Sequence, residues 1–181
     1  MKISKDLGKF YHYAFPMQAV LVTCTDKKGV TNPITIAWHT PISKKPPLYA
    51  ISVAPGRYSY NLIKENKEFV INFANYELVK KVHFCGSHSG RNTDKIKQAG
   101  LTLENSEKIK TKYIKECYTH FECKLFKTIP LGDHSLFIGE IVNIKSNKDA
   151  YENELLSKNM QPCFYIGDCV YTTIKDKRDE I

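Results

Sequence analysis

The sequence predicts a mainly β protein with short helices, arranged as an antiparallel barrel. Several runs are apolar, β-branched or alternating, as strands are. Tight turns such as DKKG at 26–29 and GDH at 132–134 join neighbouring runs. The helical patterns are short and do not alternate regularly with the strands. This combination favours an antiparallel barrel over a parallel sheet of alternating strands and helices.

Length and composition indicate a single folded domain over residues 1–181, with a flexible C-terminal tail from about residue 175. Hydrophobic residues make up 42% of the chain and charged residues 25%, which excludes the disordered and collagen-like classes. No apolar run reaches the roughly 18 residues of a membrane span, and the N-terminus lacks the apolar core of a secretion signal. We therefore expect a cytoplasmic protein without a membrane partner.

The formal net charge of +8 is compatible with nucleic acid, a phosphate-bearing ligand or an acidic partner protein. Much of the excess is lysine in polar segments such as 108–116, which we interpret as solvated. Charge alone does not choose among these partners.

The first part of the chain predicts a weakly helical stretch to about Phe15 and then three strands. QAVLVTCT at 18–25 is a β-branched apolar run, and VTNPITIAW at 30–38 resumes an extended pattern after a turn, which predicts a hairpin. Two prolines in ISKKPPL end any element, and YAISVA at 49–54 is the next strand.

The middle of the chain predicts two helices around a strand. Ser59 is expected to cap a helix that runs through Asn66, and EFVINFA at 68–74 alternates as a strand does. ELVKKVHFCG at 77–86 has helical spacing and ends in glycine. The turn-rich region that follows contains one short helix candidate, TDKIKQAG.

The last third predicts strands again. They cover 118–131, 135–145 and 163–174, with the GDH turn between the first two. The segment 149–159 between the later strands is expected to be helical or loop-like.

The stretch SVAPGRYSYNLIKEN, which begins at residue 52, predicts a phosphate pocket. A helix N-terminus has free N–H groups and a partial positive charge, and both favour an anion. Arg57 adds a bidentate donor there, and Ser59, Tyr60 and Asn61 add polar groups. A plain N-cap at Ser59 with a solvated Arg57 explains the same motif equally well.

A second polar cluster, NPITIAWHT, lies on the preceding strand from Asn32 to Thr40. Regular alternation would place Asn32, Ile34, Ile36 and Trp38 on one face, and Thr35, Ala37 and His39 on the other. Backbone edges with asparagine and threonine side chains can bond a flat heteroaromatic ring. Trp38 would cover such a ring or fill the core.

Five motifs, in order along the chain, then resemble a known family. They are N-x-x-T-x-A-W-x-T-P-I-S from residue 32, PPLYAISVAPGRYSYNLI from 46, FVINF from 69, CGSHSGRNTDKI from 85 and GDHSLFIGEI from 132. Together they look like the flavin reductase-like, flavoredoxin-type proteins with an FMN-binding split barrel. The resemblance covers about residues 15–145.

The resemblance implies a six-stranded antiparallel split barrel of Greek-key type, a homodimer with flavin near the subunit interface, and FMN as the ligand. It implies that the strand Asn32–Thr40 lies along the isoalloxazine ring, and that the loop and helix from Ser89 to Lys95 lie near the cofactor. The implied cofactor-binding residues are Asn32, Thr35, Ala37, Trp38, His39, Thr40, Val53, Arg57, Ser59, Tyr60, Asn61, Ser89, Gly90, Arg91 and Lys95. His134 of the GDH turn would face the flavin or the nicotinamide site.

The sequence departs from the family pattern at three places. Tyr60 stands where the family more often has a small hydroxyl residue, and Asn92-Thr93 replaces a frequent acidic-apolar pair. The part after Tyr151 has no recognisable family signature.

The implied reaction takes hydride from NADH or NADPH through FMN to flavin or another acceptor, so the protein supplies position and charge rather than a covalent nucleophile. In keeping with this, the sequence has no G-x-S-x-G, P-loop or G-x-G-x-x-G motif. His134 is the candidate catalytic residue, because a histidine can donate to reduced flavin or to the nicotinamide. A turn histidine that points to solvent is the alternative.

The cysteines do not predict a metal site. Cys85 lies near two histidines, and Cys117, His120 and Cys123 are spaced by three, but neither spacing is that of structural zinc. We expect reduced, buried thiols, and a thiol relay beside the flavin stays open for Cys85.

Two other functions remain as alternatives. A flavoredoxin-like carrier would keep the FMN, exchange electrons with a redox protein partner and have no NAD(P)H turnover of its own. A basic β-barrel that binds nucleic acid would need exposed aromatics interleaved with Lys or Arg, and no such pattern is clear, so we expect no nucleic acid partner.

Overall fold

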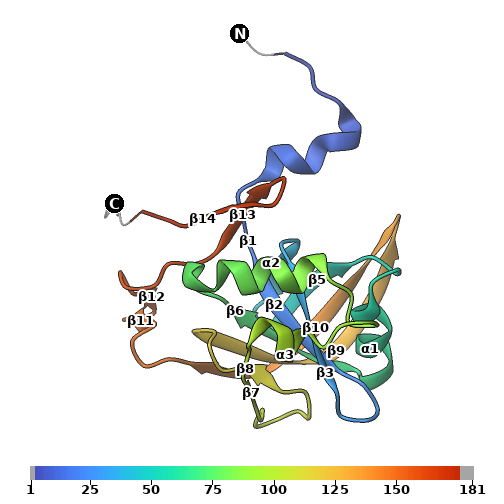
Figure 1. The fold of residues 1–181 in the computed structure, drawn as a ribbon, viewed down its shortest axis with the longest axis vertical. Coiled ribbons are helices and arrows are strands. Elements are labelled where there is room, and N and C mark those ends of the chain that lie inside the picture. The colour runs from blue at the N-terminus through green and yellow to red at the C-terminus, as the bar shows by residue number, and fades with distance from the viewer. Residues whose placement is uncertain (1–2, 176–181) are drawn as a thin grey trace.

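The structure, a computed structural model that describes residues 3–175, centres on one curled antiparallel sheet (Figure 1). Its seven strands follow the order β3-β2-β6-β9-β10-β5-β4, and all neighbouring pairs are antiparallel. Their bounds are Val20–Thr25 (β2), Thr31–Ile36 (β3), His39–Ser43 (β4), Leu48–Val53 (β5), Glu68–Phe73 (β6), Thr119–Leu131 (β9) and His134–Ser146 (β10). The predicted mainly β class with short helices is confirmed.

Short helices and small sheets surround this sheet. The helices are η1 (Leu7–Ala14), α1 (Tyr58–Asn66), η2 (Tyr76–Leu78), α2 (Val79–Ser87) and α3 (Lys95–Ala99). The short strands are β1 (Met17–Gln18), β7 (Leu103–Glu104), β8 (Tyr113–Ile114), β11 (Tyr151–Glu152), β12 (Leu155–Leu156), β13 (Phe164–Gly167) and β14 (Val170–Thr172). In Figure 1, α2 and α3 lie together along one outer face of the sheet, against β3.

Two apolar cores lie on the two sides of β2. Val20 and Val22 point into the barrel, where they pack in one cluster with Phe69. Leu21 points the other way and packs in a second cluster with Val82 of α2. Because both faces of β2 are buried, its sequence VLVTCT begins with three consecutive apolar residues instead of alternating. The second cluster fixes α2 against the sheet.

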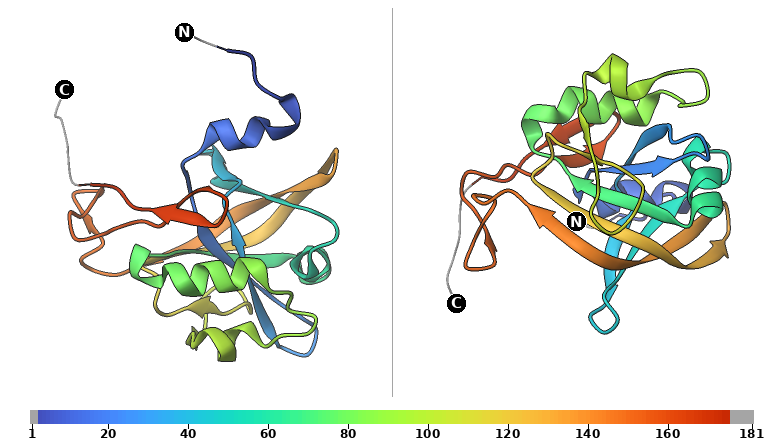
Figure 2. Two further views of the ribbon diagram at one scale, coloured as in Figure 1. Left: turned by 45° about the horizontal axis from the view of Figure 1, so that its top comes forward. Right: turned by 90° about the horizontal axis from the view of Figure 1, so that it is seen from below.

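Segments near the two ends of the described chain meet over the same end of the barrel. β1 pairs with β13, with Gln18 opposite Phe164. Phe15 packs edge-on against Tyr165, with 5.1 Å between ring centroids. Figure 2 shows η1 and the hairpin of β13 and β14 on one side of the barrel. Segments from opposite ends of the sequence therefore share one wall of the molecule.

Two strand predictions are corrected. The strand expected over 30–38 ends at Ile36, and a separate edge strand, β4, begins at His39, which gives seven strands where the resemblance implied six. The strand expected over 163–174 is a hairpin instead. Asp168 and Cys169 adopt left-handed backbone conformations, with φ of 48° and 62°, and turn the chain there.

Two helix predictions are also corrected. The segment 149–159 is neither helix nor plain loop but contains the hairpin of β11 and β12. The helix expected to be capped by Ser59 begins at Tyr58, and Ser59 lies inside it. The flexible tail expected from about residue 175 falls on 176–181, outside the described residues. No helix within residues 3–175 has the length and apolar character that a membrane span requires.

Candidate functional site

Two adjoining cavities lie where β3, the start of α1 and the end of α2 meet. The larger has a volume of about 370 Å³ and the smaller about 200 Å³. Ile34, Arg57, Gly86 and Ser87 line both, so the two cavities lie side by side. A space of this size is typical of a small-molecule or cofactor site.

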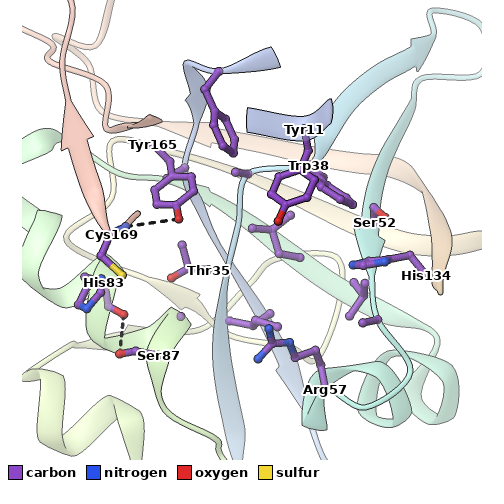
Figure 3. A pocket seen from close by; sticks show the side chains of 18 of the residues that line it. Tyr11, Thr35, Trp38, Ser52, Arg57, His83, Ser87, His134, Tyr165 and Cys169 are labelled. Carbon is purple, nitrogen blue, oxygen red and sulfur yellow. Dashed lines mark hydrogen bonds between the residues drawn. The ribbon is translucent and has the colours of Figure 1, made fainter. Parts of the chain in front are cut away.

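Aromatic side chains wall the larger cavity. Trp38 packs against His134, with 5.0 Å between ring centroids, and against Tyr11 of η1, with 5.8 Å. Figure 3 shows Trp38, Ser52 and His134 on one side of the cavity, and Arg57 at its lower edge. Walls of this kind favour a flat ring, because aromatic side chains stack on planar ligands.

His134 is the first residue of β10 and follows the turn at Gly132, whose φ is +58°. Its Nδ1 donates to the Asp133 carboxylate at 2.8 Å. This bond holds the pKa of Asp133 below its usual value. With Nδ1 committed, Nε2 is the atom left to contact a ligand, as an acceptor in the neutral ring and as a donor in the protonated one.

The smaller cavity gathers positive charge. Arg57, Arg91 and Lys95 all line it. Arg91 donates from Nη1 to the Gly56 carbonyl at 3.0 Å and lies over the Tyr58 ring. Within residues 3–175, none of these three cations forms an ion pair with a carboxylate. A doubly charged anion would balance this excess of positive charge.

Lys95 is the most unusual of the three cations, because its side chain is only 4% exposed. Its Nζ donates to the Cys85 carbonyl at 2.9 Å, which uses one of three donor hydrogens. Burial lowers its pKa. A buried ammonium with one neutral partner is costly, and an anion in the cavity would relieve that cost.

Two close contacts shape the smaller cavity. Asn32 donates from Nδ2 to Ser59 Oγ at 2.8 Å, so this bond leaves the serine proton uncommitted. Gly90 lies directly against Asn32, because a Cβ at this position would be 1.9 Å from Asn32 Oδ1. Glycine is therefore required where the loop after α2 meets β3.

The structure brings most of the predicted site residues to these two cavities. Those that line the larger one are Thr35, Ala37, Trp38, Val53, Arg57 and His134. Those that line the smaller one are Asn32, Arg57, Ser59, Ser89, Gly90, Arg91 and Lys95. Their roles toward a ligand stay predictions.

Four predicted residues line neither cavity: His39, Thr40, Tyr60 and Asn61. Both ring nitrogens of His39 are occupied, by the Tyr49 hydroxyl at 2.7 Å and the Gln18 carbonyl at 2.8 Å, and burial lowers its pKa. Tyr60 shares a hydrogen bond with Ser135 at 3.0 Å and packs against the barrel core. Thr40 and Asn61 are exposed. Their side chains are thus committed elsewhere or point to solvent.

The motifs missed several lining residues at the two ends of the chain and elsewhere. They are Tyr11, Phe15, Ser52, His83, Ser87, Tyr165, Cys169 and Tyr171. Ser52 and Ser87 lie within the family motifs but were not among the predicted site residues. No local signal marks the lining residues of η1 and of the hairpin of β13 and β14, because these segments reach the cavity only through tertiary packing. Cys85 lines the smaller cavity, but burial raises the pKa of its thiol to about 11, so it is a poor nucleophile at neutral pH.

Comparison with known proteins gives a consistent result. The family described as "Flavin reductase like domain" matches residues 12–165. An uncharacterized protein from Archaeoglobus fulgidus is 36% identical over 141 residues, which are 78% of each chain. The flavoredoxin of Desulfovibrio vulgaris (Miyazaki F) superposes with a TM-score of 0.87 at 27% identity, covering 98% of this chain and 97% of that one. A flavoredoxin from Methanosarcina acetivorans gives 0.87 at 27% identity, over 99% and 95%.

Proposed function

The chain belongs to the flavin reductase-like family, and from this we propose that it binds FMN and works as an oxidoreductase that takes hydride from NADH or NADPH. The two flavoredoxins that resemble it in structure support a flavin ligand. The chain's own residues support the same ligand, because its two cavities match the two chemically different ends of FMN.

The observation that carries the proposal is the group of three cations beside an aromatic cavity, none of which pairs with a carboxylate of residues 3–175. Arg57, Arg91 and Lys95 would hold the phosphate, with Ser59 as a further donor. Arg57 also lines the larger cavity, so it lies at the passage that the ribityl chain would follow. The aromatic cavity of about 370 Å³ would then receive the isoalloxazine ring.

FMN, when bound, would supply the hydride chemistry itself. The chain's residues would position the ring and exclude water: Trp38 covers part of the cavity, and Thr35 is fixed by a hydrogen bond to the Val82 carbonyl. His134, held by Asp133, would place Nε2 to exchange a proton or a hydrogen bond with the ring or with the nicotinamide. No covalent nucleophile is needed.

The visible absorption spectrum of the purified protein tests the flavin proposal, followed by chromatographic identification of any released flavin. We expect a yellow protein that releases FMN, or a colourless one that binds added FMN stoichiometrically. Arg57→Ala should weaken the binding of FMN. A protein that never takes up FMN, or an Arg57→Ala variant with undiminished affinity, would contradict the proposal.

A second function, that of an electron carrier without NAD(P)H turnover, is favoured by the structural likeness to two flavoredoxins and by the net charge of +8, which suits docking to an acidic redox protein. Steady-state oxidation of NADH and NADPH by the FMN-loaded protein separates the two functions. Turnover with either nucleotide supports the reductase, and no turnover with both leaves the carrier. The homodimer and the cytoplasmic location remain predictions.

A further inference from the structure

The larger cavity has a second polar wall that the FMN proposal does not use. His83 of α2 and Tyr171 of β14 both line it, and His83 Nδ1 is 3.5 Å from the Tyr171 hydroxyl oxygen. Their rings meet edge to face, with 5.9 Å between centroids. In Figure 3, His83 lies with Tyr165 and Cys169 on the side of the cavity opposite Ser52 and His134. The cavity therefore has a polar group at each side.

Tyr171 lies beyond the residues 12–165 that match the family, yet its position is well fixed. Its ring packs against Tyr165 at 5.2 Å between centroids, and the two residues are paired across the hairpin of β13 and β14. Burial raises the pKa of Tyr171 to about 12, so the phenol stays protonated at neutral pH. Tyr171 is thus a positioned, neutral donor.

The contact between Tyr171 and His83 leaves the phenol proton available. A separation of 3.5 Å is near the outer limit for a hydrogen bond, so the phenol proton is not firmly committed to His83. In the tautomer with a proton on Nδ1, His83 donates to the phenol oxygen, and the phenol proton is then free for a ligand. His83 would in this way orient the hydroxyl of Tyr171.

We propose that Tyr171, oriented by His83, donates a hydrogen bond to a carbonyl oxygen conjugated to a planar ring in the larger cavity. The phenol needs an acceptor, which a carbonyl oxygen supplies, and the surrounding aromatic walls, including Trp38 and Tyr165, favour a flat ring. The inference rests on the proposed function. Two compounds offer this chemistry: the isoalloxazine ring of FMN, and a quinone-type electron acceptor that enters the FMN-loaded protein.

The first arm of the test measures FMN affinity by quenching of tryptophan fluorescence, after removal of any bound flavin. Trp38 is the only tryptophan and lines the cavity, so its emission reports occupancy. If the flavin carbonyl is the partner, Tyr171→Phe should raise the dissociation constant for FMN about three- to tenfold, as expected for one hydrogen bond. The visible absorption bands of the bound flavin should also shift, because they respond to hydrogen bonds at the ring.

The second arm titrates menadione into the FMN-loaded protein and follows the flavin difference spectrum. If a quinone-type electron acceptor is the partner, Tyr171→Phe should raise the dissociation constant for menadione about three- to tenfold and leave the affinity for FMN unchanged. Tyr76→Phe is the matched control: it removes a hydroxyl that contacts the Tyr171 backbone but does not line the cavity, so both affinities should stay within twofold.

His83 is tested as a positioning residue by His83→Phe, which keeps an aromatic ring and removes Nδ1. His83→Phe should cause part of the loss of ligand affinity seen in Tyr171→Phe, and the same shift of the flavin absorption bands. The double variant His83→Phe/Tyr171→Phe should bind the ligand little more weakly than Tyr171→Phe alone. A loss of affinity of Tyr171→Phe in either arm supports the inference and identifies the ligand. Unchanged affinity for both ligands in Tyr171→Phe overturns it and leaves the proposed function standing, whereas a wild-type protein that binds no flavin overturns both.

Discussion

Replacement of Lys95 by methionine tests the phosphate site at its most distinctive atom. The change keeps an unbranched side chain and removes the ammonium group. Lys95 is only 4% exposed, and within residues 3–175 its ammonium has one hydrogen-bond partner, the Cys85 carbonyl. In the ligand-free protein two effects oppose each other: the cost of a buried, unpaired cation disappears, and the Cys85 carbonyl loses its partner. We expect the free energy of unfolding to change by no more than about 1 kcal/mol.

The effect on the ligand should be much larger. A hydrogen bond to a charged group contributes about 1.5–3 kcal/mol, and each 1.4 kcal/mol is a factor of about ten, so the dissociation constant for FMN should rise about 10- to 150-fold. The lower part of this range is favoured, because Arg57 and Arg91 are exposed and water screens the same phosphate. Riboflavin has no phosphate, so its affinity should not change.

Titration of FMN and riboflavin against Trp38 fluorescence gives both numbers in one assay. Lys97→Met is the matched control, because Lys97 lies on the same helix but is exposed. Burial lowers the pKa of Lys95, so the wild-type affinity for FMN should also fall on the alkaline side as this cation loses its proton, and Lys95→Met should lack that fall. Equal losses for FMN and riboflavin, or no loss for FMN, would refute a phosphate at Lys95.

Three further changes have defined outcomes. Gly90→Ala places a Cβ 1.9 Å from Asn32 Oδ1, so it should lower the free energy of unfolding, measured by urea titration, by about 1–3 kcal/mol. It should also lower the affinity for FMN. Tyr60→Phe removes a hydroxyl bonded to Ser135, away from both cavities, so FMN affinity should stay within twofold, and a tenfold loss would return Tyr60 to the site. Burial lowers the pKa of His120 to about 4, below the unfolded value of about 6.5, so stability is full above about pH 6.5 and falls by up to about 3 kcal/mol as the pH drops toward 4. His120→Gln, which does not titrate, should flatten this dependence in unfolding experiments at pH 7 and pH 5.

The sequence predicted most of the long strands and the position of Arg57 and Ser59 beside a cavity, because these signals are local. The turn at Gly56 and the helix that follows are encoded within a few residues, and Arg57 and Ser59 reach the smaller cavity as expected. Ser59 does so for a different reason than predicted. It is buried inside the helix and accepts a hydrogen bond from Asn32, instead of capping the helix end.

The aromatic wall was not predictable in the same way. Tyr11 and Tyr165 reach the cavity because η1 and the hairpin of β13 and β14 fold over the same end of the barrel. Such contacts depend on pairing between β1 and β13, which join opposite ends of the chain. Periodicity and turn residues carry no information about that pairing, so this wall of the site is a property of the tertiary structure.

The break in the strand after Ile36 explains why His39, which the family resemblance placed along the flavin ring, does not line the cavity. In one continuous strand, Ala37 and His39 would share a face and Trp38 would oppose them. Instead the chain leaves the sheet for two residues, so Ala37 and Trp38 both line the larger cavity while His39 turns into the core beside Tyr49. The Trp38 carbonyl accepts from the backbone N–H of Ser52 at 2.9 Å, which keeps this irregular segment attached to β5. The loss of regular pairing therefore lets both side chains line the cavity, because a regular strand would have directed one of them away from it.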